Sequence, residues 1–396
     1  TNTGSILGEQ DYGVGFGSDL LTATLVNEGT ITSLAVSGVD HSSRADLTVT
    51  SAADGVIEGG TSGIYSGASG TLTVENAGTI RGNGTYDGFD GAPDAGITIA
   101  TANSSVTNSG TISGAGAGIT TAYQYDEEAD ALVLLATGTV VTNSGTIAGE
   151  ANDGVRLIGG GSVTNSGTIT GTGSPGADGI SMFPGPDQAN ADYVAQVANL
   201  DAGTIAGDRF GIILTGGGTV DNAGDIAGGF GGVFVQAIAS NSAEGEDRAG
   251  LVGAVTNSGT IRGTGPAENE GAGVAFGSGL GEATLINTGT IVSDNFVGVE
   301  QGSTADLLVQ NLVGGTIEGG TSGIYGGSSG SMTIENAGTI RGNGTYDGFD
   351  APPDAGITIA TAGSSVTNSG TISGAGTGIT TAYVFDAEQN ALVGQA

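Results

Sequence analysis

The sequence predicts an all-β fold, a right-handed parallel β-helix whose roughly triangular coils hold about 21–36 residues including loops. Three observations lead to this prediction. Gly makes up 80 of the 396 residues while 37% of the chain is hydrophobic, so the glycines punctuate a folded chain and not a disordered linker. A short motif, Asn-x-Gly-Thr-Ile or a close variant, recurs at the spacing of a solenoid. No stretch carries the apolar period of a helix.

The motif recurs from one end of the sequence to the other. Its full copies begin at Asn2, Asn27, Asn76, Asn108, Asn143, Asn165, Asn222, Asn257, Asn287, Asn336 and Asn368, and we expect degenerate copies at Ser51, Asp201 and Asn311. Each unit reads as three short runs of alternating β-branched residues, such as 105–108, 110–114 and 118–121. Glycines bound these runs, which indicates three short strands joined by tight turns and hence a triangular coil.

The facing of the side chains follows from the strand period of two. The Ile of Gly-Thr-Ile and the Val two residues before the Asn are expected to point inward, in stacked apolar columns that include Ile112 and Val106. The motif Asn is expected to sit in a left-handed turn, since Asn tolerates that backbone conformation. Coils stacked about 4.8 Å apart would also let successive Asn amides form a hydrogen-bonded ladder. These Asn residues are therefore expected to be structural.

The sequence also contains a longer repeat in addition to the short motif. Residues 56–123 match residues 316–383 at an offset of 260, and ten of the 68 positions differ, which leaves 58 identical. We interpret residues 1–396 as one continuous solenoid that has grown by tandem duplication. The sequence begins and ends within the repeat pattern, so we expect a segment of a longer protein.

The string Val-Thr-Asn-Ser-Gly-Thr-Ile, at 106–112, 255–261 and 366–372, resembles the passenger regions of autotransporter-type adhesins and of large repetitive bacterial surface proteins. The resemblance covers essentially the whole chain. It implies a right-handed parallel β-helix exposed on the surface of a Gram-negative cell. It carries over no catalytic residue, because the motif marks the turns of the coil.

Composition excludes several classes of function. The formal net charge is −34, and all seven basic residues are Arg, so nucleic-acid binding is not expected. Cysteine is absent, which removes disulfides, thiol catalysis and Cys-based metal sites. No apolar run reaches the roughly 18 residues of a membrane span. The expected partners are other copies of this chain, or glycans or proteins on the surface of host or neighbouring cells.

One loop carries candidate metal ligands. The run 82–94 holds Asp87, Asp90 and Asp94 among glycines, and it recurs at 342–354 with Asp347, Asp350 and Asp354. Ca²⁺ binds six to eight oxygens, including the carbonyl groups that Gly-rich loops expose. The Asp spacing is not that of an EF-hand. The six carboxylates either bind Ca²⁺ or form a solvated acidic loop.

A second insertion, at 123–132, reads as a small hairpin with a polar tip and recurs at 383–392. Its aromatic residues either bind glycans or a neighbouring subunit, or pack over a corner of the coil.

Catalytic chemistry has little support in the sequence. His41 is the only His, and its counterpart in the second block is Gln301, so a Ser–His–Asp site is not expected. Acids such as Asp208, beside Arg209, cannot be placed on one face with a partner. We therefore expect an extracellular structural or adhesive segment that is not an enzyme. The alternative is a polysaccharide-degrading lyase or hydrolase, because such enzymes also use this fold.

Overall fold

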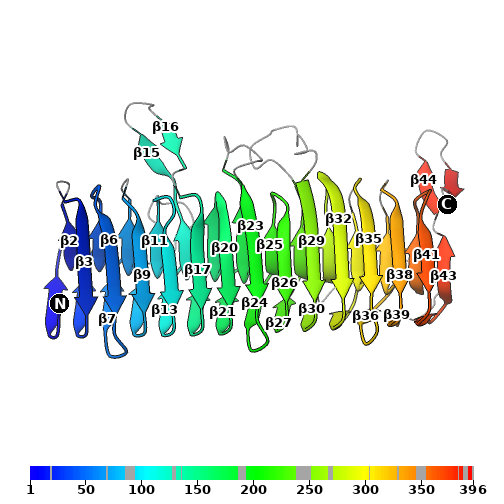
Figure 1. The fold of residues 1–396 in the computed structure, drawn as a ribbon, viewed down its shortest axis with the longest axis horizontal. Coiled ribbons are helices and arrows are strands. Elements are labelled where there is room, and N and C mark those ends of the chain that lie inside the picture. The colour runs from blue at the N-terminus through cyan, green and yellow to red at the C-terminus, as the bar shows by residue number, and fades with distance from the viewer. Residues whose placement is uncertain are drawn as a thin grey trace. The chain divides into compact units, whose positions relative to one another are not determined.

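The computed structural model describes residues 1–17, 20–67, 70–84, 94–126, 131–134, 136–185, 193–237, 251–265, 271–302, 304–327, 330–344, 354–381, 383–386 and 391–394. These residues form two compact units, Thr1–Val197 with Gly203–Asp208, and Ala198–Ala202 with Arg209–Ala396. In each unit, strands of successive coils pair in parallel in three sheets, and the described residues include no helix (Figure 1). The fold is the parallel β-solenoid with three-sided coils that the sequence predicts.

Three consecutive strands make one coil, and we number the sheets by the order in which a coil meets them. In the first unit, sheet 1 consists of β1 (Ser5–Gly8), β4 (Thr30–Ser33), β7 (Val56–Gly59), β10 (Thr79–Gly82), β13 (Thr111–Gly114), β18 (Thr146–Gly149), β21 (Thr168–Gly171) and β24 (Thr204–Gly207). Sheet 2 consists of β2 (Val14–Phe16), β5 (Val39–His41), β8 (Ile64–Ser66), β11 (Ile97–Ile99), β14 (Ile119–Thr121), β19 (Val155–Ile158) and β22 (Ile180–Phe183). Sheet 3 consists of β3 (Thr22–Asn27), β6 (Asp46–Ser51), β9 (Leu72–Asn76), β12 (Ser105–Asn108), β17 (Thr139–Asn143), β20 (Gly160–Asn165) and the first part of β23 (Val194–Asn199).

The second unit repeats this arrangement. Its sheet 1 consists of β27 (Asp225–Gly228), β30 (Thr260–Gly263), β33 (Thr290–Ser293), β36 (Thr316–Gly319), β39 (Thr339–Gly342) and β42 (Thr371–Gly374). Sheet 2 consists of β25 (Phe210–Leu214), β28 (Gly231–Val235), β31 (Ala272–Phe276), β34 (Val299–Gln301), β37 (Ile324–Gly326), β40 (Ala355–Ile359) and β43 (Thr377–Thr381). Sheet 3 consists of β26 (Gly218–Asn222), β29 (Leu251–Asn257), β32 (Leu280–Asn287), β35 (Asp306–Asn311), β38 (Met332–Asn336) and β41 (Ser365–Asn368).

Two short antiparallel hairpins are added to the coils. Strand β15 (Gln124–Asp126) pairs with β16 (Ala131–Val133), and β44 (Tyr383–Asp386) pairs with β45 (Ala391–Gly394). Figure 1 shows β15 and β16 standing away from the neighbouring coil strands. Both hairpins lie where the sequence predicts them.

The core consists of the apolar columns expected from the strand period. Ile80, Ile112, Ile147, Ile169 and Ile261 are fully buried, and Val74, Val106, Val141, Val163 and Val255 are at most 1% exposed. Within sheet 1 each Ile pairs with the Ile of the adjacent coil, as Ile80 does with Ile112. Burial of these columns supplies the main favourable free energy of the fold.

Glycine is required at a corner between sheets 1 and 2. A Cβ atom on Gly63 would lie 2.7 Å from the carbonyl oxygen of Gly96 and 2.7 Å from Cγ2 of Ile80. Gly118 is confined by the equivalent atoms of the next coils, because a Cβ atom added to it would lie 2.5 Å from the Gly154 carbonyl oxygen. The tight stacking of the coils therefore accounts for part of the high Gly content.

The motif Asn residues form a buried ladder within each unit. Asn108 Nδ2 donates to Asn143 Oδ1 at 2.8 Å, and Asn143 Nδ2 donates to Asn165 Oδ1 at 2.8 Å. Asn143 Nδ2 also donates to the carbonyl groups of Gly145 and Thr168, both at 3.1 Å. The prediction of a structural amide ladder is therefore confirmed.

Two details of that prediction are wrong. Among described residues other than Gly, only Asn103 has a positive φ, of 52°, so the ladder residues do not occupy left-handed turns. Their amide side chains, and not an unusual backbone, explain the recurrence of Asn. The degenerate copy also sits at Asn199 and not at Asp201, because Asn199 Nδ2 donates to Asn222 Oδ1 at 2.8 Å. Three residues separate Asn199 from the Gly of Gly-Thr-Ile where the regular motif has one, and these two extra residues shifted the sequence alignment.

Candidate functional site

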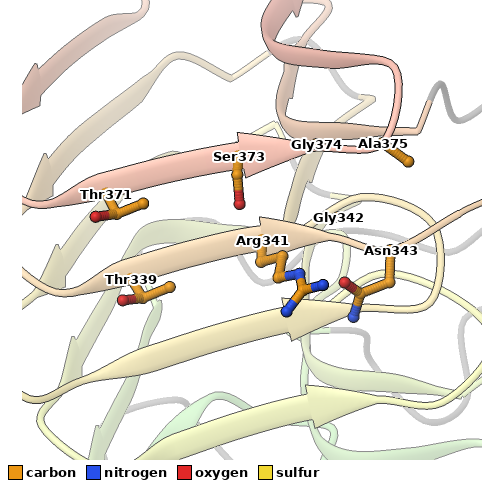
Figure 2. Close-up of a pocket in the computed structure, with 8 residues that line it drawn as sticks. All are labelled: Thr339, Arg341, Gly342, Asn343, Thr371, Ser373, Gly374 and Ala375. Carbon is orange, nitrogen blue, oxygen red and sulfur yellow. The ribbon is translucent and has the colours of Figure 1, made fainter.

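A shallow groove lies on the outer face of sheet 1 in the second unit. Its volume is about 470 Å³, and it is lined by two neighbouring strands and the bends that follow them: Thr339, Arg341, Gly342, Asn343, Thr371, Ser373, Gly374 and Ala375. Figure 2 shows the Arg341 and Asn343 side chains directed away from β42. Asn343 Nδ2 donates to Glu318 of β36, which fixes the amide at the rim.

The residues that line this groove also occur in the first unit. At an offset of 260, all eight groove residues recur unchanged: Thr79, Arg81, Gly82, Asn83, Thr111, Ser113, Gly114 and Ala115. There β13 is followed by β18, and Arg81 Nη2 lies 3.6 Å from Glu150 Oε1 in an exposed ion pair. The groove is thus part of a repeated outer surface of hydroxyl, amide and guanidinium groups. Its chemistry suits weak polar contacts with a partner.

The predicted calcium ligands are only partly described. Asp87, Asp90, Asp347 and Asp350 lie outside the described residues. The Asp94 carboxylate lies against Gly84, where its Oδ1 would be 1.6 Å from an added Cβ atom. Asp354 lies against Gly344 in the same way, at 1.5 Å. Among the described residues, no three His, Cys, Asp or Glu side chains are grouped so that they could hold a metal ion.

His41 lies in the core of sheet 2. His41 Nδ1 is 2.8 Å from Ser66 Oγ, and Nε2 is 2.6 Å from the carbonyl oxygen of Ala45. Both His41 and Ser66 are fully buried, and burial lowers the pKa of the imidazole. This Ser–His geometry is sealed from solvent, and in the second unit Gln301 Nε2 donates to Ala305 O at 2.7 Å instead. The His41 ring therefore has a structural role: its hydrogen bond to the Ala45 carbonyl oxygen stabilises the bend of the coil after β5.

The acid pair that sequence reasoning missed is Asp153 with Asp178. These residues precede the corner glycines of adjacent coils, and they are 4% and 0% exposed. Asp153 Oδ1 accepts from the Asp178 amide at 2.8 Å, and Oδ2 accepts from Ser181 Oγ at 2.5 Å. Burial first, and then the charge of Asp178, raises the pKa of Asp153 to about 6.

The sequence did hold a signal for this pair. The position before the corner glycine carries Ala or Ser in several other coils, such as Ala95, Ala117 and Ser62. In two successive coils the position before the corner glycine carries Asp in place of a small residue, and this departure from the pattern indicates a buried charge. The pair has no solvent-exposed face, so we assign it to the core and not to a substrate site.

Asp208, the other acid considered for catalysis, has a structural contact. Its Oδ2 accepts a hydrogen bond from the Gly173 amide at 2.8 Å within the first unit. This bond ties the bend after β24 to the bend after β21.

Comparison with known proteins identifies no relative, since no family model, no curated protein and no solved structure matches this chain. Across the residues that the structure describes, no helix is long and apolar enough to span a membrane.

Proposed function

We propose that this chain is an extracellular structural and adhesive β-solenoid, a segment of a long repetitive surface protein or filament. In this role it mediates cell-surface adhesion, cell–cell contact or matrix assembly. Its partners are other copies of itself, or glycans or proteins on the surface of host or neighbouring cells. Like the autotransporter passengers that the sequence resembles, it acts at the surface of a Gram-negative bacterium and is not an enzyme.

The observation that carries this proposal is the duplication of an outer surface. The eight residues of the sheet 1 groove occur in both units without a single difference. Two identical weak sites on one chain raise the strength of attachment through avidity, whereas a catalytic site gains little from a second copy. The net charge of −34 keeps such a surface soluble and favours cationic partners.

Beads coated with the whole chain provide the test. We expect them to attach to intact cells of the producing bacterium, and Arg81→Ser or Arg341→Ser to weaken attachment only slightly. The double variant should lose about ten- to a hundredfold in avidity, because both copies of the surface are then changed. Arg44→Ser, at an exposed position outside the groove, removes the same charge and serves as the control.

Two results would contradict the proposal. Coated beads that fail to attach, or double-variant beads that attach as well as the original, would remove the adhesive role. The second assay incubates the chain with soluble acidic and neutral polysaccharides and follows viscosity and new reducing ends. Depolymerisation by the purified chain would establish the alternative, a β-helix lyase or hydrolase.

A further inference from the structure

A second pocket, in the second unit, lies on the outer face of sheet 2. Its volume is about 170 Å³, and four phenylalanines and one carboxylate line it: Phe210, Phe230, Phe234, Phe296 and Glu300. The other lining residues are Gly and Ala, which leave the aromatic rings accessible. The pocket is therefore an aromatic wall around a single charged group.

The rings form a packed but partly open cluster. The Phe210 and Phe234 rings stack with centroids 5.3 Å apart and an interplanar angle of 24°. Phe296 is 8% exposed, and it packs in a cluster with Val297 against which Phe234 lies. Phe230 is 43% exposed and stands at the mouth. The Arg209 guanidinium lies 5.4 Å from the Phe210 centroid, so this cluster already holds one cation against a ring.

Glu300 is the unusual member of the pocket. Among the described residues, no hydrogen bond or ion pair to its carboxylate is found, and burial alone raises its pKa. Its charge in turn contributes to the raised pKa of Tyr325, the residue paired with it on β37. A carboxylate held among aromatic rings is costly unless a cation joins it.

The first unit offers an internal comparison. The counterparts of Phe296 and Glu300, at an offset of 260, are Val36 and Asp40. Asp40 accepts a hydrogen bond from Ser42 Oγ at 3.1 Å, and the pKa of Tyr12 is raised chiefly by the Asp40 charge. The carboxylate position is thus shared by both units, but the position of Phe296 carries Val36 in the first unit.

The chemistry of the lining selects the ligand. Sugar rings need several hydrogen-bonding groups, and the side chains of this pocket supply one. A primary ammonium would leave N–H donors unpaired against the rings. A quaternary ammonium group has no N–H, is attracted to aromatic faces, and neutralises a carboxylate. We propose that the Phe210–Phe230–Phe234–Phe296 pocket binds a quaternary ammonium group, with Glu300 as its counter-ion.

Isothermal titration of the whole chain with choline and with tetramethylammonium tests this proposal. The neutral analogue 3,3-dimethylbutan-1-ol has the shape of choline without its charge. We expect the two cations to bind at least about tenfold more tightly than the neutral analogue, at constant ionic strength. Glu300→Gln should remove most of that difference, while Asp225→Asn, an exposed carboxylate on sheet 1, should leave it unchanged.

Phe230→Leu separates ring chemistry from apolar area. Because Phe230 is exposed at the mouth, the fold should tolerate the change. Choline should bind several-fold more weakly to this variant, while the neutral analogue binds about as before. Equal affinity for choline and its neutral analogue, no measurable binding, or equal losses in Glu300→Gln and Asp225→Asn would each overturn the proposal. Binding of neutral monosaccharides at this site in place of the cations would also overturn it. None of these outcomes depends on the adhesive role.

Discussion

At the scale of single residues, the amide ladder has one visible defect. Ser51 occupies the ladder position between Asn27 and Asn76, with which it pairs in β3 and β9. In the part of the chain that the structure describes, Ser51 Oγ and Asn76 Oδ1 are buried without hydrogen-bond partners. The counterpart in the second unit is Asn311, which accepts from Asn287 and donates to Asn336, both at 2.8 Å. The second unit thus has, at Asn311, the two side-chain hydrogen bonds that the first unit lacks at Ser51.

We expect Ser51→Asn to stabilise the protein by about 1 kcal/mol, because it satisfies two buried polar atoms with hydrogen bonds. The reciprocal change, Asn311→Ser, should destabilise it by about 1–3 kcal/mol, since it orphans the amides on either side. Urea unfolding followed by far-UV circular dichroism measures both changes. If Ser51→Asn instead lowers the free energy of unfolding, completing the amide ladder at this position does not stabilise the protein.

The buried Asp153–Asp178 pair makes a pH prediction. The pKa of Asp153 in the folded protein, about 6, lies above the ordinary value of 3.8. The folded state therefore holds more protons than the unfolded state between these values, and its stability falls as the pH rises through this window. Acidification from pH 7 to pH 5 should recover part of that loss.

The matched variant is Asp153→Asn. An Asn can still accept from the Asp178 amide while its own amide donates to Ser181 Oγ, and it cannot ionise. At pH 7 we expect a gain of roughly 1–3 kcal/mol in the free energy of unfolding. The difference between original and variant should shrink towards pH 5 when both are unfolded with urea. A difference that does not change with pH would rule out ionisation of Asp153 as the cause.

At the scale of strands, the alternation of side chains decides which residues the core accepts. In β13, Ile112 is fully buried and Thr111 is exposed, as the period of two predicts. Ile112→Asp should cost roughly 3–5 kcal/mol, because it buries a charge between stacked coils. Thr111→Asp, one residue away, should cost less than about 1 kcal/mol. Thermal melting compares the two, and similar losses would show that the facing of β13 is wrong.

The strands could be predicted because their signals are local and repeated. Three-sided coils, the Ile and Val columns and both hairpins follow from motifs within a few residues of each other. The ladder position of Asn199 could not be predicted, because two inserted residues placed Asp201 at the spacing from Gly203 that the motif Asn normally has. The Phe230 and Glu300 pocket was also missed. Its residues come from separate coils with no common motif, so only the stacking of the strands brings them together.

At the scale of the whole molecule, the duplicated acidic loops remain a prediction. If these loops bind Ca²⁺, millimolar calcium should raise the melting temperature by mass action. Asp94→Asn with Asp354→Asn should reduce the shift, and magnesium at equal concentration controls for screening of the net charge of −34. Calorimetry without heat of binding, together with an unchanged melting temperature, would leave only solvated loops.

The constant register of the coils has a consequence for how such proteins change over generations. Asn108, Asn143 and Asn165 stand opposite one another, and the residues after each read Ser-Gly-Thr-Ile. Loss of residues 144–165 by recombination would join Asn143 directly to Ser166 and leave the junction sequence unchanged. The neighbouring coils would then meet with their Asn, Val and Ile residues still aligned. The number of coils can therefore change by one coil at a time through recombination while the fold stays constant. Selection can then act on the length of the solenoid.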